Sequence, residues 1–147
     1  MKKIYSFKIV RVPDYDADLS YLGTFDDVAK SDLAVEHEPG NPRVLHWFNP
    51  QPGTVETKDQ AEQVYDRMVA YEKGEWGMVS VKAIATIGTS DDGKVWLSNE
   101  IQSDGVHGVE DDMDSADIET EEAEQLISTL KSLGFTREEI EEAQHKD

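Results

Sequence analysis

Residues 76–102 read WGMVSVKAIATIGTSDDGKVWLSNEIQ, and this stretch decides the fold class. Apolar side chains occupy every second position from residue 79 to residue 87, which is the period of a strand with one buried face. The turn-forming triplet Asp91-Asp92-Gly93 follows, and the alternation resumes at Val95 and Leu97. The stretch therefore predicts a β-hairpin with strands at residues 76–88 and 94–102.

Two more strands are expected on the N-terminal side of the hairpin. In residues 3–12 (KIYSFKIVRV), the large apolar side chains of Tyr5, Phe7 and Ile9 occupy every second position, and Pro13 ends the run. Residues 43–48 (RVLHWF) form a shorter apolar run, which the proline- and glycine-rich sequence at 49–53 interrupts. Together with the hairpin, these runs predict an antiparallel sheet of about four strands.

Helical segments complete the expected fold. Residues 58–73 follow a capping box formed by Thr57 and Gln60, and their apolar positions recur at helical spacing, so this helix should pack on the sheet. Residues 118–133 carry a leucine-rich stripe, and Thr136 with Glu139 opens a last helix that reaches about residue 145. We therefore expect an α+β fold with a C-terminal helix pair, in a single domain spanning residues 1–147.

The net charge of the chain is −18, and most of the excess lies in its last third. Residues 100–147 contain 16 acidic and 3 basic residues. A surface of this sign repels nucleic acids and anionic membranes, so we expect no direct contact with either. The chain has no cysteine and no apolar run long enough to span a bilayer, which together favour a cytoplasmic protein without disulfides or thiolate metal sites.

Nine acidic residues lie within residues 110–124, with no basic residue among them. A few acids near a helix N-terminus favour the helix dipole, but nine also repel one another. One interpretation is a solvated acidic face. The other, which we prefer, is a binding surface for a basic protein, in which the carboxylates imitate the phosphates of a nucleic acid. The candidate partner-binding residues are Glu110, Asp111, Asp112, Asp114, Asp117, Glu119, Glu121, Glu122 and Glu124.

Two other classes of function stay open. Aspartate-rich segments at Asp14, Asp16 and Asp18 and at residues 111–117 could hold a divalent cation through carboxylate oxygens, although neither has the spacing of an EF-hand loop. An enzyme with an unmarked site would need a histidine such as His46 or His107 near a serine and a carboxylate. No motif for a cofactor, a metal or a catalytic nucleophile is present, so we expect no cofactor and no enzymatic activity.

Three stretches resemble a family of uncharacterised small acidic proteins from phages, plasmids and bacterial genomes. They are residues 18–23 (DLSYLG), residues 67–76 (RMVAYEKGEW) and residues 103–112 (SDGVHGVEDD), followed by an acidic helix that ends in LKSLGF. The family pattern at the third stretch is similar to SGGLWGIESD, and here His107 replaces its tryptophan and Asp104 a glycine. The resemblance implies a mobile-element origin, and hence an inhibitor of host defence or of host DNA-handling proteins, as a DNA mimic would be.

Overall fold

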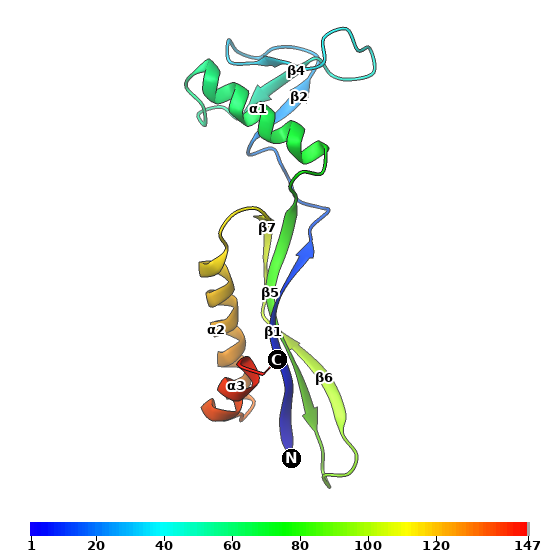
Figure 1. Ribbon diagram of the computed structural model, residues 1–147, viewed down its shortest axis with the longest axis vertical. Helices are drawn as coiled ribbons and strands as arrows, with labels where there is room; N and C mark the ends of the chain where they lie inside the picture. The colour runs from blue at the N-terminus through cyan, green and yellow to red at the C-terminus, as the bar shows by residue number, and fades with distance from the viewer. Residues whose placement is uncertain (147) are drawn as a thin grey trace. The chain divides into compact units, whose positions relative to one another are not determined.

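The computed structural model of the protein describes residues 1–146, and its internal contacts divide the chain into two compact units (Figure 1). Unit 1 combines Met1–Tyr15 with the chain from Met78 onward, and unit 2 comprises Asp16–Gly77. The length of the chain predicts one domain around one sheet, whereas the structure places a separate small sheet in each unit.

Unit 1 is built on a four-stranded antiparallel sheet with β5 (Met78–Thr89) at its centre. Strand β1 (Lys2–Pro13) pairs with residues 79–89 of β5 along one edge. Two shorter strands share the other edge: β6 (Leu97–Gln102) pairs with residues 84–89 of β5, and β7 (Val106–Glu110) pairs with residues 78–81. Residues 103–105 therefore form a break in an otherwise continuous edge.

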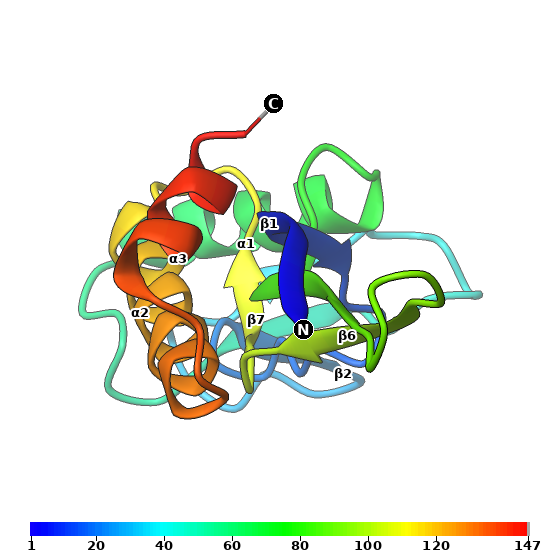
Figure 2. The same ribbon diagram turned by 90° about the horizontal axis from the view of Figure 1, so that it is seen from below.

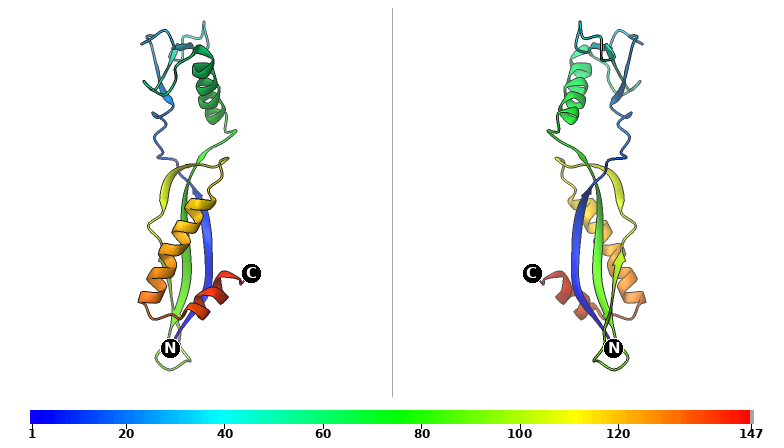
Figure 3. Two further views of the ribbon diagram at one scale, coloured as in Figure 1. Left: turned by 90° about the vertical axis from the view of Figure 1, so that its left-hand side faces the viewer. Right: turned by 90° about the vertical axis from the view of Figure 1, so that its right-hand side faces the viewer.

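Both C-terminal helices cover the same face of this sheet. Helix α2 (Ala116–Ser132) and helix α3 (Arg137–Gln144) lie together on one side of β1 and β5 (Figures 1 and 2). The odd-numbered residues of β5 point toward them, as the alternation of a strand requires. The buried core of unit 1 contains Ala83, Ala85, Ile87, Leu126, Leu130, Phe135 and Ile140. In the right-hand view of Figure 3, the strands stand in front of both helices, so within the described residues of unit 1 no helix covers the second face of the sheet.

Unit 2 contains a three-stranded sheet and one helix. The strand order is β2 (Gly23–Asp26), β4 (Trp47–Pro50) and β3 (Val35–Glu36), and α1 (Lys58–Glu72) packs against it. The centre of this core is Phe48, whose side chain is fully buried in contact with Val35, Ala61 and Met68.

The structure confirms the α+β class and most of the helical boundaries. The capping boxes of Thr57 with Gln60 and of Thr136 with Glu139 are both formed, and α2 and α3 make up the expected C-terminal pair. The hairpin is formed by β5 and β6, with Gly93 at a positive φ of 76° in its turn.

Two expectations about the sheet are wrong. The run at 43–48 does not join the hairpin: its strand is β4, displaced to residues 47–50, and it pairs with β2 and β3 in unit 2. Helix α1 accordingly packs on the sheet of unit 2 rather than on that of the hairpin. The partners of β4 are β2 and β3, which lie within residues 14–42. The sequence predicts a loop there because strands of two to four residues are too short to show an alternating apolar pattern.

The stretch at 67–76 has a structural explanation within unit 2. The guanidinium of Arg67 lies 3.6 Å from the ring centroid of Trp76, and Trp76 Nε1 donates a hydrogen bond to the Arg67 carbonyl at 2.8 Å. Tyr71 meets the same indole edge-on, and Gly74 adopts a positive φ of 78° between them. These residue types therefore fasten the end of α1, which is a role in folding. No helix within residues 1–146 has the length and apolar character needed to cross a membrane.

Candidate protein-binding site

The nine candidate acids do not form one uniform surface. Glu110 is half-buried at the end of β7, whereas Asp111, Asp112 and Asp114 are exposed in the loop that leads to α2. On the helix, Glu119 is half-buried and Glu122 is buried, at 6% exposure. The remaining helical acids, Asp117, Glu121 and Glu124, are exposed.

The helical acids divide between two faces of α2. Asp117, Glu121 and Glu124 have the spacing i, i+4, i+7 and so lie on one face. Glu122, Leu126 and Leu130 are spaced by four residues on the opposite face and are buried against the sheet. The exposed acidic row therefore comprises six residues: Asp111, Asp112, Asp114, Asp117, Glu121 and Glu124.

A hydrogen-bonded clasp fixes α2 to the break between β6 and β7. Ser103 is 8% exposed, and its hydroxyl donates to Glu122 Oε1 at 3.1 Å while accepting the Ala83 N–H at 2.8 Å. The Asp104 N–H donates to Gln125 Oε1 at 2.6 Å, and Gln125 Nε2 returns a bond to the Asp104 carboxylate at 3.0 Å. Glu122 is thus a structural group that orients α2, and the assignment of Glu122 to the binding surface does not fit its burial.

The start of α2 is also held by the acidic loop. The Ser115 side chain forms no cap, and Asp114 Oδ1 instead accepts the Ala116 N–H at 2.9 Å. Arg11 donates to the backbone carbonyl of Asp111 at 3.3 Å, so a base from β1 holds the loop without covering its carboxylate. The loop acids consequently keep a defined position relative to the helical ones.

Four of the six carboxylates of this row are left without a neutralising partner among the described residues. Within residues 1–146, no ion pair or side-chain hydrogen bond is formed by the carboxylates of Asp111, Asp117, Glu121 or Glu124. Salt bridges of the unit's helices involve α3 instead, where Arg137 meets Glu141 at 2.9 Å. The exposed acidic row is therefore a patch of negative potential on a rigid element.

The aspartate-rich segments do not form a recognisable cation site. Among residues 1–146, no group of three or more histidine, aspartate or glutamate side chains is arranged to hold a metal ion. Asp18 Oδ1 accepts the Ser20 N–H at 2.8 Å, and hydrogen bonds from Ser20 lower the pKa of the Asp18 carboxyl. The Asp18 carboxylate is thus held by the backbone of its own loop, and the geometry gives the cation-binding alternative no support.

A serine and a histidine do meet on the uncovered face of the unit 1 sheet. The Ser80 hydroxyl lies 2.6 Å from His107 Nδ1, and the adjacent Gly108 N–H donates to Asp14 Oδ2 at 2.8 Å. A nucleophile and a base in contact are one requirement of covalent catalysis. Because this contact is exposed to solvent, the pair has no enclosure that would exclude water from a reaction.

Of the other histidines, His145 follows α3 in unit 1, and the remaining two belong to unit 2. His46 is half-buried, and its carbonyl accepts the His37 N–H at 2.7 Å. His37 is the buried one: its Nδ1 lies 2.9 Å from the Tyr65 hydroxyl and its Nε2 lies 3.6 Å from a carboxylate oxygen of Glu38. Burial raises the pKa of Tyr65, and the charge of Glu38 adds to that shift. The cluster lies among Phe25 and Phe48, which suits a satisfied core histidine.

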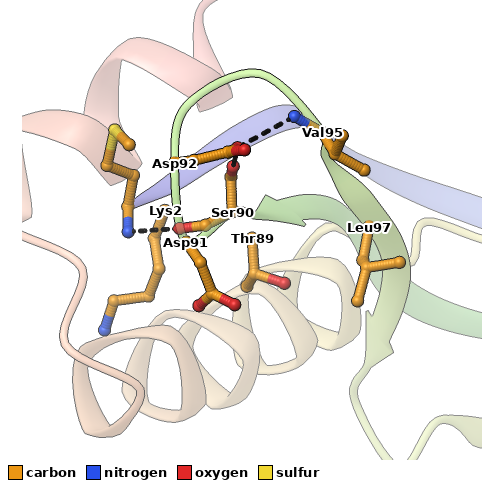
Figure 4. Close-up of a pocket in the computed structure, with 8 residues that line it drawn as sticks. Lys2, Thr89, Ser90, Asp91, Asp92, Val95 and Leu97 are labelled. Carbon is orange, nitrogen blue, oxygen red and sulfur yellow. Dashed lines mark hydrogen bonds between the residues drawn. The ribbon is translucent and has the colours of Figure 1, made fainter.

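The tip of the β5–β6 hairpin lines an open, solvent-exposed cavity of about 440 Å³ (Figure 4). The terminal amine of Met1 donates to the Ser90 carbonyl at 2.7 Å, which ties the start of the chain to this turn. Asp92 Oδ1 accepts N–H bonds from Lys94 at 2.8 Å and Val95 at 3.1 Å. These bonds lower the pKa of the Asp92 carboxyl, because they stabilise its charged form.

The order of the hairpin tip should consequently depend on pH, because the Asp92 carboxylate holds it through hydrogen bonds. Since the pKa of Asp92 in the folded protein lies below its ordinary value of 3.8, the contribution of Asp92 to stability is present above that value and is lost as the pH falls through the folded pKa. We expect the amide resonances of Lys94 and Val95 to shift in this acidic range in an NMR titration. Asp91→Asn should leave the transition in place, whereas Asp92→Asn should remove it; a transition that survives Asp92→Asn would contradict the assignment.

Comparison of the chain with protein-family models, with curated proteins and with solved structures gave no match. The function of the chain must therefore be inferred from the geometry of the described residues.

Proposed function

We propose that this chain is an acidic protein-binding module that imitates a nucleic-acid backbone and occupies the basic surface of a DNA- or RNA-binding or defence protein of a host. The observation that carries the proposal is the exposed acidic row: six acids on one loop and one helix face, presented by a helix that Glu122, Gln125 and the leucines fix to the sheet. A mobile-element origin, which the three sequence stretches imply, is consistent with such an inhibitor.

The spacing of the helical acids supports imitation of phosphates. An α-helix rises about 1.5 Å per residue, so Asp117 and Glu124 are separated by roughly 10 Å along the axis. A strand of B-DNA rises roughly 3.4 Å per phosphate, so the three helical carboxylates extend over about three phosphate-to-phosphate steps. The loop acids Asp111, Asp112 and Asp114 continue the row beyond the helix start.

The energetics predict an electrostatic mode of binding. An exposed ion pair contributes about 0–1 kcal/mol, so affinity requires several of these contacts together. A concentrated patch also accelerates encounter with a basic partner, and salt weakens the attraction because the screening length shrinks to about 8 Å at physiological ionic strength. If the acidic residues served only to keep the surface solvated, the chain would have no basic partner with this salt-sensitive affinity.

The proposal can be tested by affinity capture. The immobilised chain is exposed to a bacterial lysate, and bound proteins are eluted with a gradient of sodium chloride. We expect DNA- or RNA-binding proteins that elute early and that added duplex DNA also releases. Recovery of no such protein would favour the solvated-face interpretation, and elution that salt does not promote would argue against electrostatic imitation.

A further inference from the structure

The sheet of unit 1 has two free edges, and their sequences differ in how they discourage further pairing. The edge strand β1 carries Lys2, Lys3, Lys8 and Arg11, has a register irregularity between Ile4 and Ser6, and ends in Pro13. Charged side chains, above all lysine, bulges and prolines are among the devices by which edge strands avoid other strands. Strand β6 (LSNEIQ) has no lysine, proline or register irregularity and a single charged residue, Glu100, and five of its six residues are exposed.

The hydrogen-bond register shows which main-chain groups of β6 face outward. The Ser103 N–H donates to the Ala83 carbonyl, so residues 83 and 103 form a hydrogen-bonded pair. Because such pairs alternate along an antiparallel ladder, residues 97, 99 and 101 direct their N–H and C=O groups to β5. Ser98, Glu100 and Gln102 therefore present theirs to solvent, and β6 pairs only with β5 among the described strands.

An apolar patch lies at the start of this edge. Met1, Val95 and Leu97 are exposed at 64%, 70% and 67%, and all three line the cavity at the hairpin tip (Figure 4). Leu97 pairs with Thr89, so its side chain points to the face of the sheet that carries the helices, where it stays exposed. A strand placed beside β6 would cover Leu97 with its own side chains.

We propose that β6 is a docking edge, at which an extended segment of a partner protein adds as a further strand. The two faces of β6 specify the chemistry of that segment. Leu97 and Ile101 lie on the helix-bearing face and favour apolar neighbours, whereas Glu100 lies on the opposite face and favours a basic one. The edge is also flanked by acidic residues, Asp91, Asp92 and Asp104, which favour basic residues in the segment. The two faces together therefore specify a segment in which apolar and basic residues alternate.

A second copy of this chain is a poor occupant for the same edge. Antiparallel pairing of β6 with its own copy would bring the two Glu100 side chains near each other, and each copy carries a net charge of −18. Docking at β6 is independent of the proposed function, because its contacts are main-chain hydrogen bonds at β6 and not carboxylates of the exposed acidic row.

The test uses the full chain and an acetylated, amidated peptide of sequence VKVKVKV as the probe. A peptide of the same composition in blocks, VVKKKVV, controls for attraction between lysines and the acidic surface. We expect the alternating peptide to bind more tightly, to shift amide resonances of residues 97–102, and to slow hydrogen exchange at Ser98, Glu100 and Gln102. Equal binding of the two peptides, shifts confined to residues 110–124, or no binding would overturn the proposal.

Variants separate docking from folding. Ser98→Pro removes an outward N–H while leaving the β5 pairing intact, and it should weaken binding of the alternating peptide by about tenfold or more. Leu97→Lys places a charge on the exposed patch and should have a similar effect, whereas Val12→Lys on the β1 edge is the matched control. If Ser98→Pro fails to fold, Leu97→Lys still decides; full binding by a folded Leu97→Lys variant would overturn the proposal.

Discussion

Replacing the six residues of the exposed acidic row with lysine should weaken binding to a basic partner at least about 100-fold. If each exposed carboxylate contributes about 0.5 kcal/mol, six of them contribute roughly 3 kcal/mol, and the introduced lysines add repulsion. The measurement is an equilibrium titration of the captured partner by fluorescence anisotropy. The variant carries Asp111, Asp112, Asp114, Asp117, Glu121 and Glu124 changed to lysine, and it keeps Glu122 because that residue is buried.

A matched variant distinguishes a local surface from total charge. Unit 2 offers six exposed acids whose reversal changes the net charge equally: Asp27, Asp32, Glu36, Glu56, Glu62 and Glu75. Reversal of these residues should weaken the partner's affinity only a few-fold, through the long-range field. Retention of full affinity by the first variant, or equal loss in both, would refute a binding surface on α2.

Leu126→Ala should lower the free energy of unfolding of unit 1 by about 2–5 kcal/mol. Leu126 is fully buried, and it packs on the sheet residues of the unit 1 core. Its truncation removes apolar contacts and leaves a cavity that the surrounding structure refills only in part. Hydrogen exchange at the Val81 and Ala85 amides measures the effect, since these residues lie at the centre of the sheet.

The outward face of the same helix supplies the control for this substitution. Ser128→Ala changes an exposed position on α2 and should alter the free energy of unfolding by no more than about 0.5 kcal/mol. A loss below about 1 kcal/mol for Leu126→Ala would contradict the packing of α2 on the sheet. In that case the exposed acidic row would have no fixed scaffold.

Sequence patterns identified the long elements and missed the short ones for a physical reason. Strand β5 has twelve residues, and α1 and α3 carry capping boxes, so each has a local signal that is independent of its tertiary partner. Strand β7 has five residues, with Gly108 at a positive φ of 67° and no apolar alternation. It forms because it pairs with residues 78–81 of β5, so its formation depends on a tertiary contact and not on its own sequence pattern.

The candidate site shows the same limit at the level of single residues. Charge density alone identified residues 110–124, but it did not separate Glu122 from Glu121. The helical period places Glu122 in line with Leu126 and Leu130, and this signal could have assigned it to the buried face. Ser103, which donates a hydrogen bond to Glu122, lies in the break between β6 and β7. Nothing in the sequence around Glu122 indicates this contact, because the two residues are 19 positions apart.

The most direct test of the central claim is competition between this protein and DNA for one partner surface. Labelled duplex DNA is bound to the captured nucleic-acid-binding protein, and the acidic chain is titrated in while DNA release is followed by fluorescence anisotropy. We expect complete displacement, with an apparent inhibition constant that rises linearly with the DNA concentration and increases with added salt. A ternary complex, in which the partner holds both DNA and this protein, would contradict it.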